Sequence, residues 1–99
     1  MGWMYILACF DDSYYVGSTV DLSKRLKEHM AGRGANHTKT RLPVRLVYHE
    51  EFEHIYSAWM RERQIHNWSH KKKKALIEGD LDRLKQLSER RTPNKATNK

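Results

Sequence analysis

The sequence predicts an α+β domain in which a small, mainly antiparallel three-stranded β-sheet is flanked by helices. Two short apolar runs, residues 3–10 and 14–19, lie on either side of Asp11-Asp12-Ser13, which is typical of a tight turn. Together they predict a β-hairpin. Two later segments have helical periodicity, and an alternating segment between them predicts a third strand.

The register of the hairpin decides which of its side chains share a face. An odd-numbered loop, such as residues 11–13, places Tyr5 and Tyr15 on the same face of the sheet, whereas a two-residue loop places them on opposite faces unless a bulge intervenes. Gly17 lies inside the second strand, where a glycine usually marks a bulge or a close backbone approach.

A helix is expected over residues 21–31, with Asp21 at its start and Gly32 after its end. Arg25 and His29 lie four residues apart and therefore share one stripe, which we expect at the edge of the core. The apolar stripe beside it recurs every fourth residue and consists of Leu22, Leu26 and Met30.

Residues 32–43 are expected to form a basic loop, and residues 44–49 a third strand. Alternation places Val44, Leu46 and Tyr48 on one face of that strand. Pro43 suits the first position of an edge strand because it has no N–H to donate.

The second long helix is expected over residues 54–68, and its apolar stripe contains a carboxylate. Glu62 lies in line with Ile55, Ala58, Trp59 and Ile65. A carboxylate on a buried face is costly unless it is paired or bound to a metal. The alternatives are that Glu62 is exposed or forms an ion pair with a neighbouring arginine.

Two short helices should follow, the first starting after Ser69 with Lys71–Lys74 exposed, and the second starting after Gly79. The expected domain spans residues 1–90. Residues 92–99 contain no apolar side chain larger than alanine, so residues 91–99 are expected to be a disordered tail.

The net charge of +7 favours a polyanionic partner, and nucleic acid fits a basic protein of this size. No stretch is long and apolar enough for a membrane span, and the N-terminus does not have the pattern of a signal peptide, so we expect a cytoplasmic protein without a membrane partner. The single cysteine, Cys9, excludes an internal disulfide and a thiolate metal cluster.

The order of the polar and glycine residues resembles the GIY-YIG nuclease superfamily, and in particular its small, single-domain bacterial branch. The resemblance covers residues 3 to about 88. The matching residues are Tyr5, the run Tyr15-Val16-Gly17, Arg25, His29 and Glu62, with Gly32-Arg33-Gly34-Ala35, Thr38 and Lys39 in the loop.

This resemblance implies a metal-dependent endonuclease that hydrolyses phosphodiester bonds in DNA, with repair or recombination as its setting. It implies one Mg²⁺ or Mn²⁺ ion held by Glu62, and Arg25 paired with phosphate oxygens. Tyr5 or Tyr15 would orient or deprotonate the water, and His29 would assist as a polar or general-acid contact.

Gly17 would leave room for the phosphate backbone. Further phosphate contacts are expected from basic residues of the loop and of the lysine run, namely Arg33, Lys39, Arg41, Lys71 and Lys72. No recognition helix or appended reader is evident, so a protein partner could supply specificity. The form of the substrate and the oligomeric state are left open.

Simpler interpretations accompany each of these assignments. Tyr5 and Tyr15 could be core aromatics, since tyrosine favours strands. Arg25 and His29 could form a solvated helix edge. At the level of function, the alternative is a nucleic-acid-binding module that keeps the GIY-YIG fold without turnover.

Overall fold

The computed structural model describes residues 1–89. The chain has two compact units, residues 1–67 and a second unit that begins at Trp68. The predicted tail, residues 91–99, lies outside the described residues, and the domain limit predicted at residue 90 stays a prediction. The elements are β1 (Gly2–Ala8), β2 (Tyr14–Thr19), α1 (Leu22–Met30), α2 (Asn36–Lys39), β3 (Arg45–Phe52), α3 (Ile55–His66), α4 (His70–Glu78) and α5 (Leu81–Glu89).

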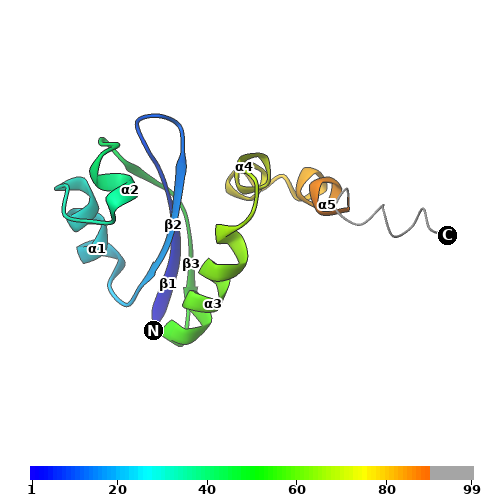
Figure 1. Ribbon diagram of the computed structural model, residues 1–99. Coiled ribbons are helices and arrows are strands. Elements are labelled where there is room, and N and C mark those ends of the chain that lie inside the picture. Colours follow the sequence, from blue (N-terminus) through cyan, green and yellow to red (C-terminus); the bar gives the residue numbers. More distant parts are fainter. Residues whose placement is uncertain (90–99) are drawn as a thin grey trace. The chain divides into compact units, whose positions relative to one another are not determined.

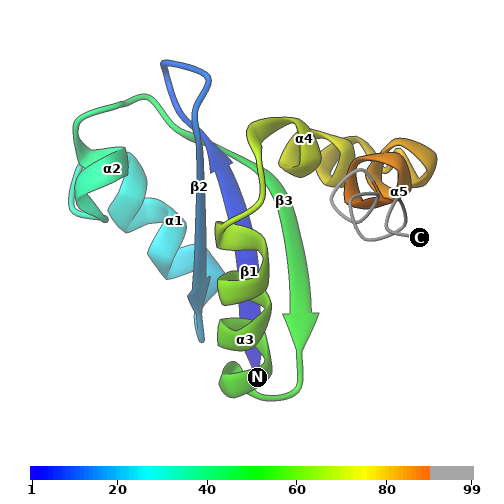
Figure 2. The same ribbon diagram turned by 45° about the vertical axis from the view of Figure 1, so that its right-hand side comes forward.

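The first unit is a three-stranded antiparallel sheet with helices on both faces, which confirms the predicted fold class. The strand order is β2-β1-β3, so β1 is central and β2 and β3 are the edges. Helices α1 and α2 lie on one face of the sheet and α3 lies on the other (Figure 1). Figure 2 shows α3 in front of β1, with β2 visible beside it.

The hairpin has the register that the odd-numbered loop predicts. Tyr5 lies opposite Gly17 and Leu7 lies opposite Tyr15, so both tyrosines are on the same face. The turn begins one residue earlier than expected, because the Cys9 N–H donates to the Ser13 carbonyl at 2.9 Å and encloses residues 10–12. Within it, Asp12 adopts the left-handed conformation with φ of 66°.

A β-bulge in β3 corrects one sequence prediction. Leu7 lies opposite Leu46 and Ile6 lies opposite Tyr48, which leaves Val47 without a partner in the ladder. Because one residue is inserted, Leu46 and Tyr48 face opposite sides of the sheet, and the prediction that they share a face is wrong.

The face under α1 carries the core cluster of Tyr5, Leu7, Cys9 and Val44, against which Leu22 and Leu26 of α1 pack. Asp21 caps α1 as predicted, since its carboxylate accepts from the Lys24 N–H at 3.1 Å. The predicted stripe fails at its last member, because Met30 is 53% exposed while His29 is completely buried. The helix turns a polar ring toward the core where the pattern predicted a methionine.

Fewer residues of α3 are buried against its face of the sheet than the apolar pattern predicted. Ala58 and Ile65 are completely buried, whereas Ile55 and Trp59 are about two-fifths exposed. The helix begins close to the sheet, because a Cβ on Gly2 would lie 2.6 Å from the Ile55 Cα. Small residues at positions 2 and 58 therefore allow α3 to approach the sheet closely.

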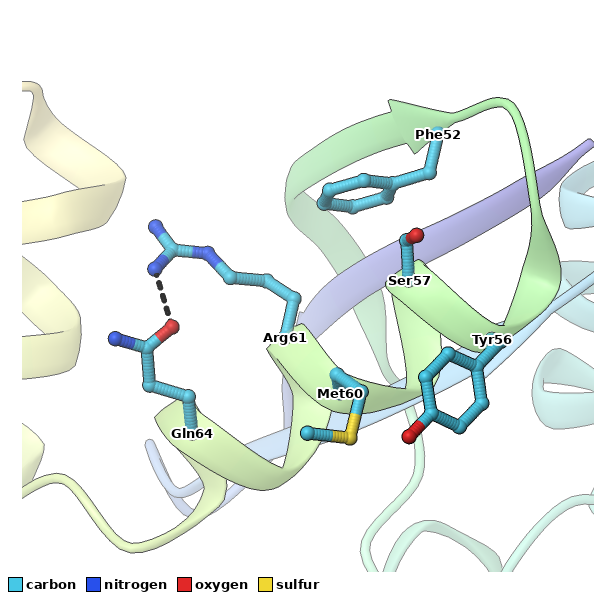
Figure 3. A pocket seen from close by; sticks show the side chains of 6 residues that line it. All are labelled: Phe52, Tyr56, Ser57, Met60, Arg61 and Gln64. Carbon is cyan, nitrogen blue, oxygen red and sulfur yellow. Dashed lines mark hydrogen bonds between the residues drawn. The ribbon is translucent and has the colours of Figure 1, made fainter.

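An ion pair joins α3 to β3. The Arg61 guanidinium donates to both carboxylate oxygens of Glu50, at 2.9 and 3.2 Å, and Tyr48 donates to the same carboxylate. Arg61 also donates to Gln64 at 2.8 Å, beside a hollow that Phe52 lines (Figure 3). This network joins Arg61 to Glu50, so α3 and β3 are linked by a charged hydrogen-bond pair.

In the second unit, Ser69 caps α4 by accepting from the Lys72 N–H at 3.1 Å. The prediction that the whole lysine run is exposed is wrong, because Lys72 is only 9% exposed. Its ammonium lies 4.2 Å from the centroid of the Trp68 ring, which is a favourable cation–π contact.

Within residues 1–89, no helix combines the length and the apolar character needed to cross a bilayer.

Candidate active site

Tyr5 connects the core to a chain of buried polar groups. Its side chain is 1% exposed, and its hydroxyl lies 2.9 Å from Nε2 of His29. Nδ1 of His29 lies 2.8 Å from the Thr38 hydroxyl, which in turn donates to the Ala35 carbonyl at 3.0 Å. The chain therefore runs from β1 through α1 to α2.

The last bond of this chain sets the direction of all the others. A carbonyl only accepts, so the Thr38 hydroxyl uses its proton on Ala35 and must accept from Nδ1 of His29. Nδ1 therefore carries the proton of the neutral ring, and Nε2 accepts from the Tyr5 hydroxyl. Tyr5 is thus a proton donor to a neutral histidine that holds one fixed tautomer.

Two glycines are required by this arrangement. A Cβ on Gly17 would lie 2.5 Å from the Tyr5 hydroxyl, and a Cβ on Gly34 would lie 2.2 Å from Nδ1 of His29. Both distances are far shorter than a carbon can tolerate, so any side chain at either position would displace the Tyr5–His29 pair. Room for a phosphate at Gly17 stays a prediction, whereas the room that this glycine gives Tyr5 is a structural fact.

Burial shifts the pKa of both members of the pair. Burial lowers the pKa of His29, the Arg25 charge lowers it further, and Glu28 acts in the opposite direction. Burial also raises the pKa of Tyr5 to about 12. At neutral pH the pair therefore consists of a protonated tyrosine and an unprotonated histidine.

The lowered pKa of His29 predicts a specific pH dependence of stability. In the unfolded chain this histidine binds a proton near its ordinary pKa of 6.5, whereas the folded protein binds it only at lower pH. The free energy of unfolding should therefore fall as the pH drops below about 6.5, by at most about 1.4 kcal/mol per pH unit. Urea unfolding between pH 7.5 and 5 measures this slope.

His29→Gln should reduce the slope, and His66→Gln is its matched control because His66 is exposed on α3. Equal slopes for the wild type and His29→Gln would contradict the buried, neutral state of His29. Lowered pKa values of Asp11 and Glu50 do not interfere, because those carboxylates start from 3.8 and 4.5 and titrate below this window.

Tyr15 lies next to this pair on the same face of the sheet. The centroid of its ring is 6.4 Å from that of Tyr5 and 5.3 Å from that of His29. On its other side it stacks with His37 at 6.2 Å, with 25° between the ring planes. Its pKa is raised by burial and by the charge of Glu62. Tyr15 thus joins the buried polar chain to the loop that follows α1.

Arg25 carries the positive charge closest to the two tyrosines. Its guanidinium donates to Glu28 at 3.0 Å within α1, and the side chain is 32% exposed. Its charge and hydrogen bonding act to lower the pKa of both Tyr5 and Tyr15, against the larger effect of burial. Arg25 is therefore partly solvated and also directed at the hydroxyls.

Glu62 approaches from the opposite face of the sheet. Its Oε1 accepts from the Ser18 hydroxyl at 2.7 Å, and the side chain is half-buried. Arg63 lies over the Trp59 ring at 4.9 Å from its centroid. The carboxylate is therefore held by β2, as its position in the apolar stripe suggested.

The two halves of the site meet at one point of the edge strand β2. The Tyr5 hydroxyl lies over Gly17 on the α1 face, and the next residue, Ser18, holds Glu62 on the α3 face. Because β2 is an edge strand of the sheet that residues 1–89 form, groups from both faces can act at this edge. The charge of Glu62 raises the pKa of Tyr5 and Tyr15, which shows that it lies within electrostatic range of both.

The predicted phosphate-binding residues lie in two parts of the chain, one around α2 and the other on α4. Arg33 and Lys39 are exposed in the segment that contains α2, and Lys71 is exposed on α4 of the second unit. Arg41 pairs with Asp11 at 2.9 Å and so ties this segment to the hairpin turn. Phosphate binding by these residues stays a prediction.

Sequence reasoning assigned no site role to three residues that shape the site, namely Ser18, Gly34 and Thr38, although the last two were among the residues that carry the family resemblance. Ser18 follows the Tyr15-Val16-Gly17 run directly, but its role depends on the packing of α3, which periodicity does not give. Gly34 and Thr38 lie in a segment expected to be a loop, where α2 instead places Thr38 under His29. Both ring nitrogens of the buried His29 are engaged, by Tyr5 and Thr38, so the predicted general-acid contact is replaced by a role that acts through Tyr5.

The donor chemistry fits one hydrated divalent cation at Glu62. Within residues 1–89, no group of three or more histidine, cysteine, aspartate or glutamate side chains could form a metal cage. Ser18 occupies one oxygen of Glu62, which leaves the other as a ligand atom. Mg²⁺ and Mn²⁺ suit a site with one carboxylate, because they keep several waters and take other ligands from phosphate.

Comparisons with known proteins agree with this geometry. The family model described as the GIY-YIG catalytic domain matches residues 1–75. A UPF0213 protein of Haloquadratum walsbyi is 41% identical over 80 residues, covering 81% of this chain and 90% of its own. A UPF0213 protein of Bacillus pumilus is 45% identical over 76 residues, covering 77% and 78%.

A solved structure is also similar. The solution NMR structure of a UPF0213 protein from Bacillus halodurans has 38% sequence identity and a TM-score of 0.51, and the match covers 79% of this chain and 84% of that one. The family model, which spans three quarters of the chain, and these relatives show that this chain belongs to the GIY-YIG family.

Proposed function

We propose that this protein is a divalent-metal-dependent endonuclease that hydrolyses phosphodiester bonds in DNA. The observation that carries the proposal is the meeting of a directed Tyr5–His29–Thr38 chain and the Glu62 carboxylate on the two sides of β2 at residues 17–18. Hydrolysis of a phosphodiester needs three groups in one place: a base, a carboxylate that can hold a metal cation, and a positive charge such as that of an arginine.

The hydrogen-bond chain supports Tyr5 rather than Tyr15 as the residue that accepts a proton from water. A free Tyr5 phenolate is unfavourable at neutral pH, because its pKa is about 12. Passing the Tyr5 proton to Nε2 of His29 as the oxygen takes a proton from water avoids that phenolate. His29 then becomes a cation whose Nδ1–H stays bonded to Thr38.

Arg25 supports binding of the phosphate. Its guanidinium is partly exposed and directed at the tyrosine hydroxyls, so a phosphodiester near those hydroxyls would meet a fixed positive charge. A cation held by Glu62 would supply further charge neutralisation as negative charge builds on the phosphate. The net charge of +7 favours attraction of the DNA backbone in general.

The alternative is a module that binds nucleic acid without cleaving it. The placement of Glu62 argues against it, because a carboxylate fixed beside a phosphate site repels the phosphate unless a cation intervenes. Ser18 holds that carboxylate in place on β2, whereas a module that only binds would gain from its loss. A role in repair or recombination and a cytoplasmic location stay predictions from the sequence.

Cleavage of labelled DNA tests the proposal. A panel of single-stranded, duplex, flap and junction DNAs is incubated with the full-length protein in Mg²⁺, Mn²⁺ or EDTA, with Glu62→Ala purified in parallel as a control for contaminating nucleases. We expect cuts that require metal and that are absent from the control. Salt-sensitive binding without cleavage of any substrate would contradict the proposal and favour the binding module.

A further inference from the structure

The outer surface of α3 exposes aromatic side chains close to Glu62. Tyr56 is 65% exposed and Trp59 is 41% exposed, and their ring centroids are 5.9 Å apart. The sequence pattern predicted Trp59 in the core, but its ring is partly exposed, so packing in the core does not account for a tryptophan at this position. Two large rings left at the surface beside a candidate site are a feature of binding surfaces.

The two rings line a hollow of about 420 Å³ between α3 and the end of β2. Its other walls come from Val20, Ile55 and residues 18–19. The volume falls within the range of roughly 300–1,000 Å³ typical of sites for small molecules. Flat aromatic and aliphatic walls suit a flat, weakly polar ligand.

This hollow is continuous with the candidate active site. Ser18 lines the hollow and also donates the 2.7 Å hydrogen bond to Glu62. A ligand in the hollow is therefore adjacent to the carboxylate that would hold the cation. The second hollow on α3, shown in Figure 3, lies beside β3 and the Arg61–Gln64 pair, and Ser18 is not among its lining residues.

Positive charge accompanies the aromatic surface. The Arg63 guanidinium lies 4.9 Å from the centroid of the Trp59 ring. A nucleotide combines a flat base with a phosphate, and here an aromatic hollow and a guanidinium are in contact with each other. An apolar protein segment would make no use of Arg63, so charge complementarity favours a nucleotide.

We propose that the hollow beside Ser18 binds an unpaired base of single-stranded DNA, which stacks against Tyr56 and Trp59 next to the phosphate to be cut. Bases in a duplex are already stacked on both sides, so only an unpaired base can offer its face. The inference rests on the proposed nuclease function and names its substrate class: single-stranded DNA or the unpaired strand of a flap.

Equilibrium binding in EDTA tests this inference without turnover. Fluorescence anisotropy compares a labelled single strand, the same sequence as a duplex, and a single strand of abasic residues, all at one salt concentration. For Trp59→Ala, we expect the Kd for the single strand to rise about tenfold, as loss of one base–aromatic stack typically gives. The Kd for the duplex and the abasic strand should change less than twofold.

Two further variants control this experiment. Trp59→Phe keeps a ring and should retain most of the affinity for the single strand. Met60→Ala removes an exposed apolar side chain from the same helix, beside the other hollow, and should bind like the wild type. Circular dichroism of each variant verifies the fold.

Equal losses on the single strand and the duplex, or no loss on either, would overturn the inference. So would a wild-type dimer that Trp59→Ala converts to a monomer in sedimentation, since the hollow would then receive a second copy. If the binding result fails while Glu62-dependent cleavage persists, the nuclease function stands alone. If the protein cleaves none of the DNAs, the binding measurement in EDTA still tests whether the hollow prefers an unpaired base.

Discussion

Glu62→Ala is expected to reduce metal-dependent cleavage to background without weakening DNA binding in EDTA. Glu62 supplies the carboxylate that fits a hydrated cation, and it lies half-buried with Ser18 on one oxygen. Within residues 1–89, no group of three or more potential metal-binding side chains offers an alternative site. Gel-based cleavage with Mg²⁺ or Mn²⁺ and anisotropy in EDTA measure the two quantities.

Glu62→Gln separates the effect of the Glu62 charge from that of its hydrogen bond to Ser18. Its amide oxygen can still accept from Ser18, so the side chain should keep its place while losing its charge. Glu51→Gln is the matched control, because Glu51 is exposed on β3 and forms no part of the candidate site. Cleavage by Glu62→Gln at the wild-type rate would contradict a role for this carboxylate in holding the cation.

Cleavage by the wild type, compared with binding, separates the two functional hypotheses. For an enzyme, loss of Glu62 removes turnover and leaves the phosphate contacts of Arg25 and the basic surface intact. For a binding module, Glu62→Ala should bind as well or better, and the wild type would show no cleavage to lose. Tighter binding together with an inactive wild type would therefore favour the module.

The polar part of the site was predictable because its residues follow local rules. Tyr5 and Tyr15 share a face as a result of strand alternation and an odd loop, and both can be counted along the sequence. Position 62 departs visibly from an apolar stripe. The order of these residues along the chain also carries the resemblance to the family.

The remaining parts depend on contacts between distant segments. His29 is buried rather than Met30 because Thr38, nine residues later, returns under the helix to satisfy its ring. The bulge at Val47 turns the side chain of Tyr48 to the other face of the sheet, and the sequence has no glycine or proline there to indicate a bulge. Ser18 could be identified only once α3 was placed on β2. Periodicity describes one element at a time and cannot supply these pairings.

Tyr5→Phe is expected to lower the rate of cleavage by roughly 10²–10⁴-fold, the usual contribution of a general base. The substitution removes the hydroxyl that donates to Nε2 of His29 and that would take the proton from water. The phenyl ring keeps its place in the core. Single-turnover cleavage at saturating protein measures the rate without interference from product release.

A loss of stability must be separated from this loss of rate. Without the hydroxyl, the buried Nε2 of His29 lacks its donor, which should lower the free energy of unfolding by about 1–3 kcal/mol. Urea titration measures that change. Activity is then compared at a temperature where both proteins are fully folded.

Tyr48→Phe is the matched control because it removes an equivalent hydroxyl outside the site. Tyr48 also donates to a partner, Glu50, and burial likewise raises its pKa to about 12. It is on the face of the sheet opposite Tyr5, so its loss should cost stability without a comparable loss of rate. Equal effects of the two substitutions on cleavage would mean that Tyr5 acts only through packing, and the proton path through His29 would have to be abandoned.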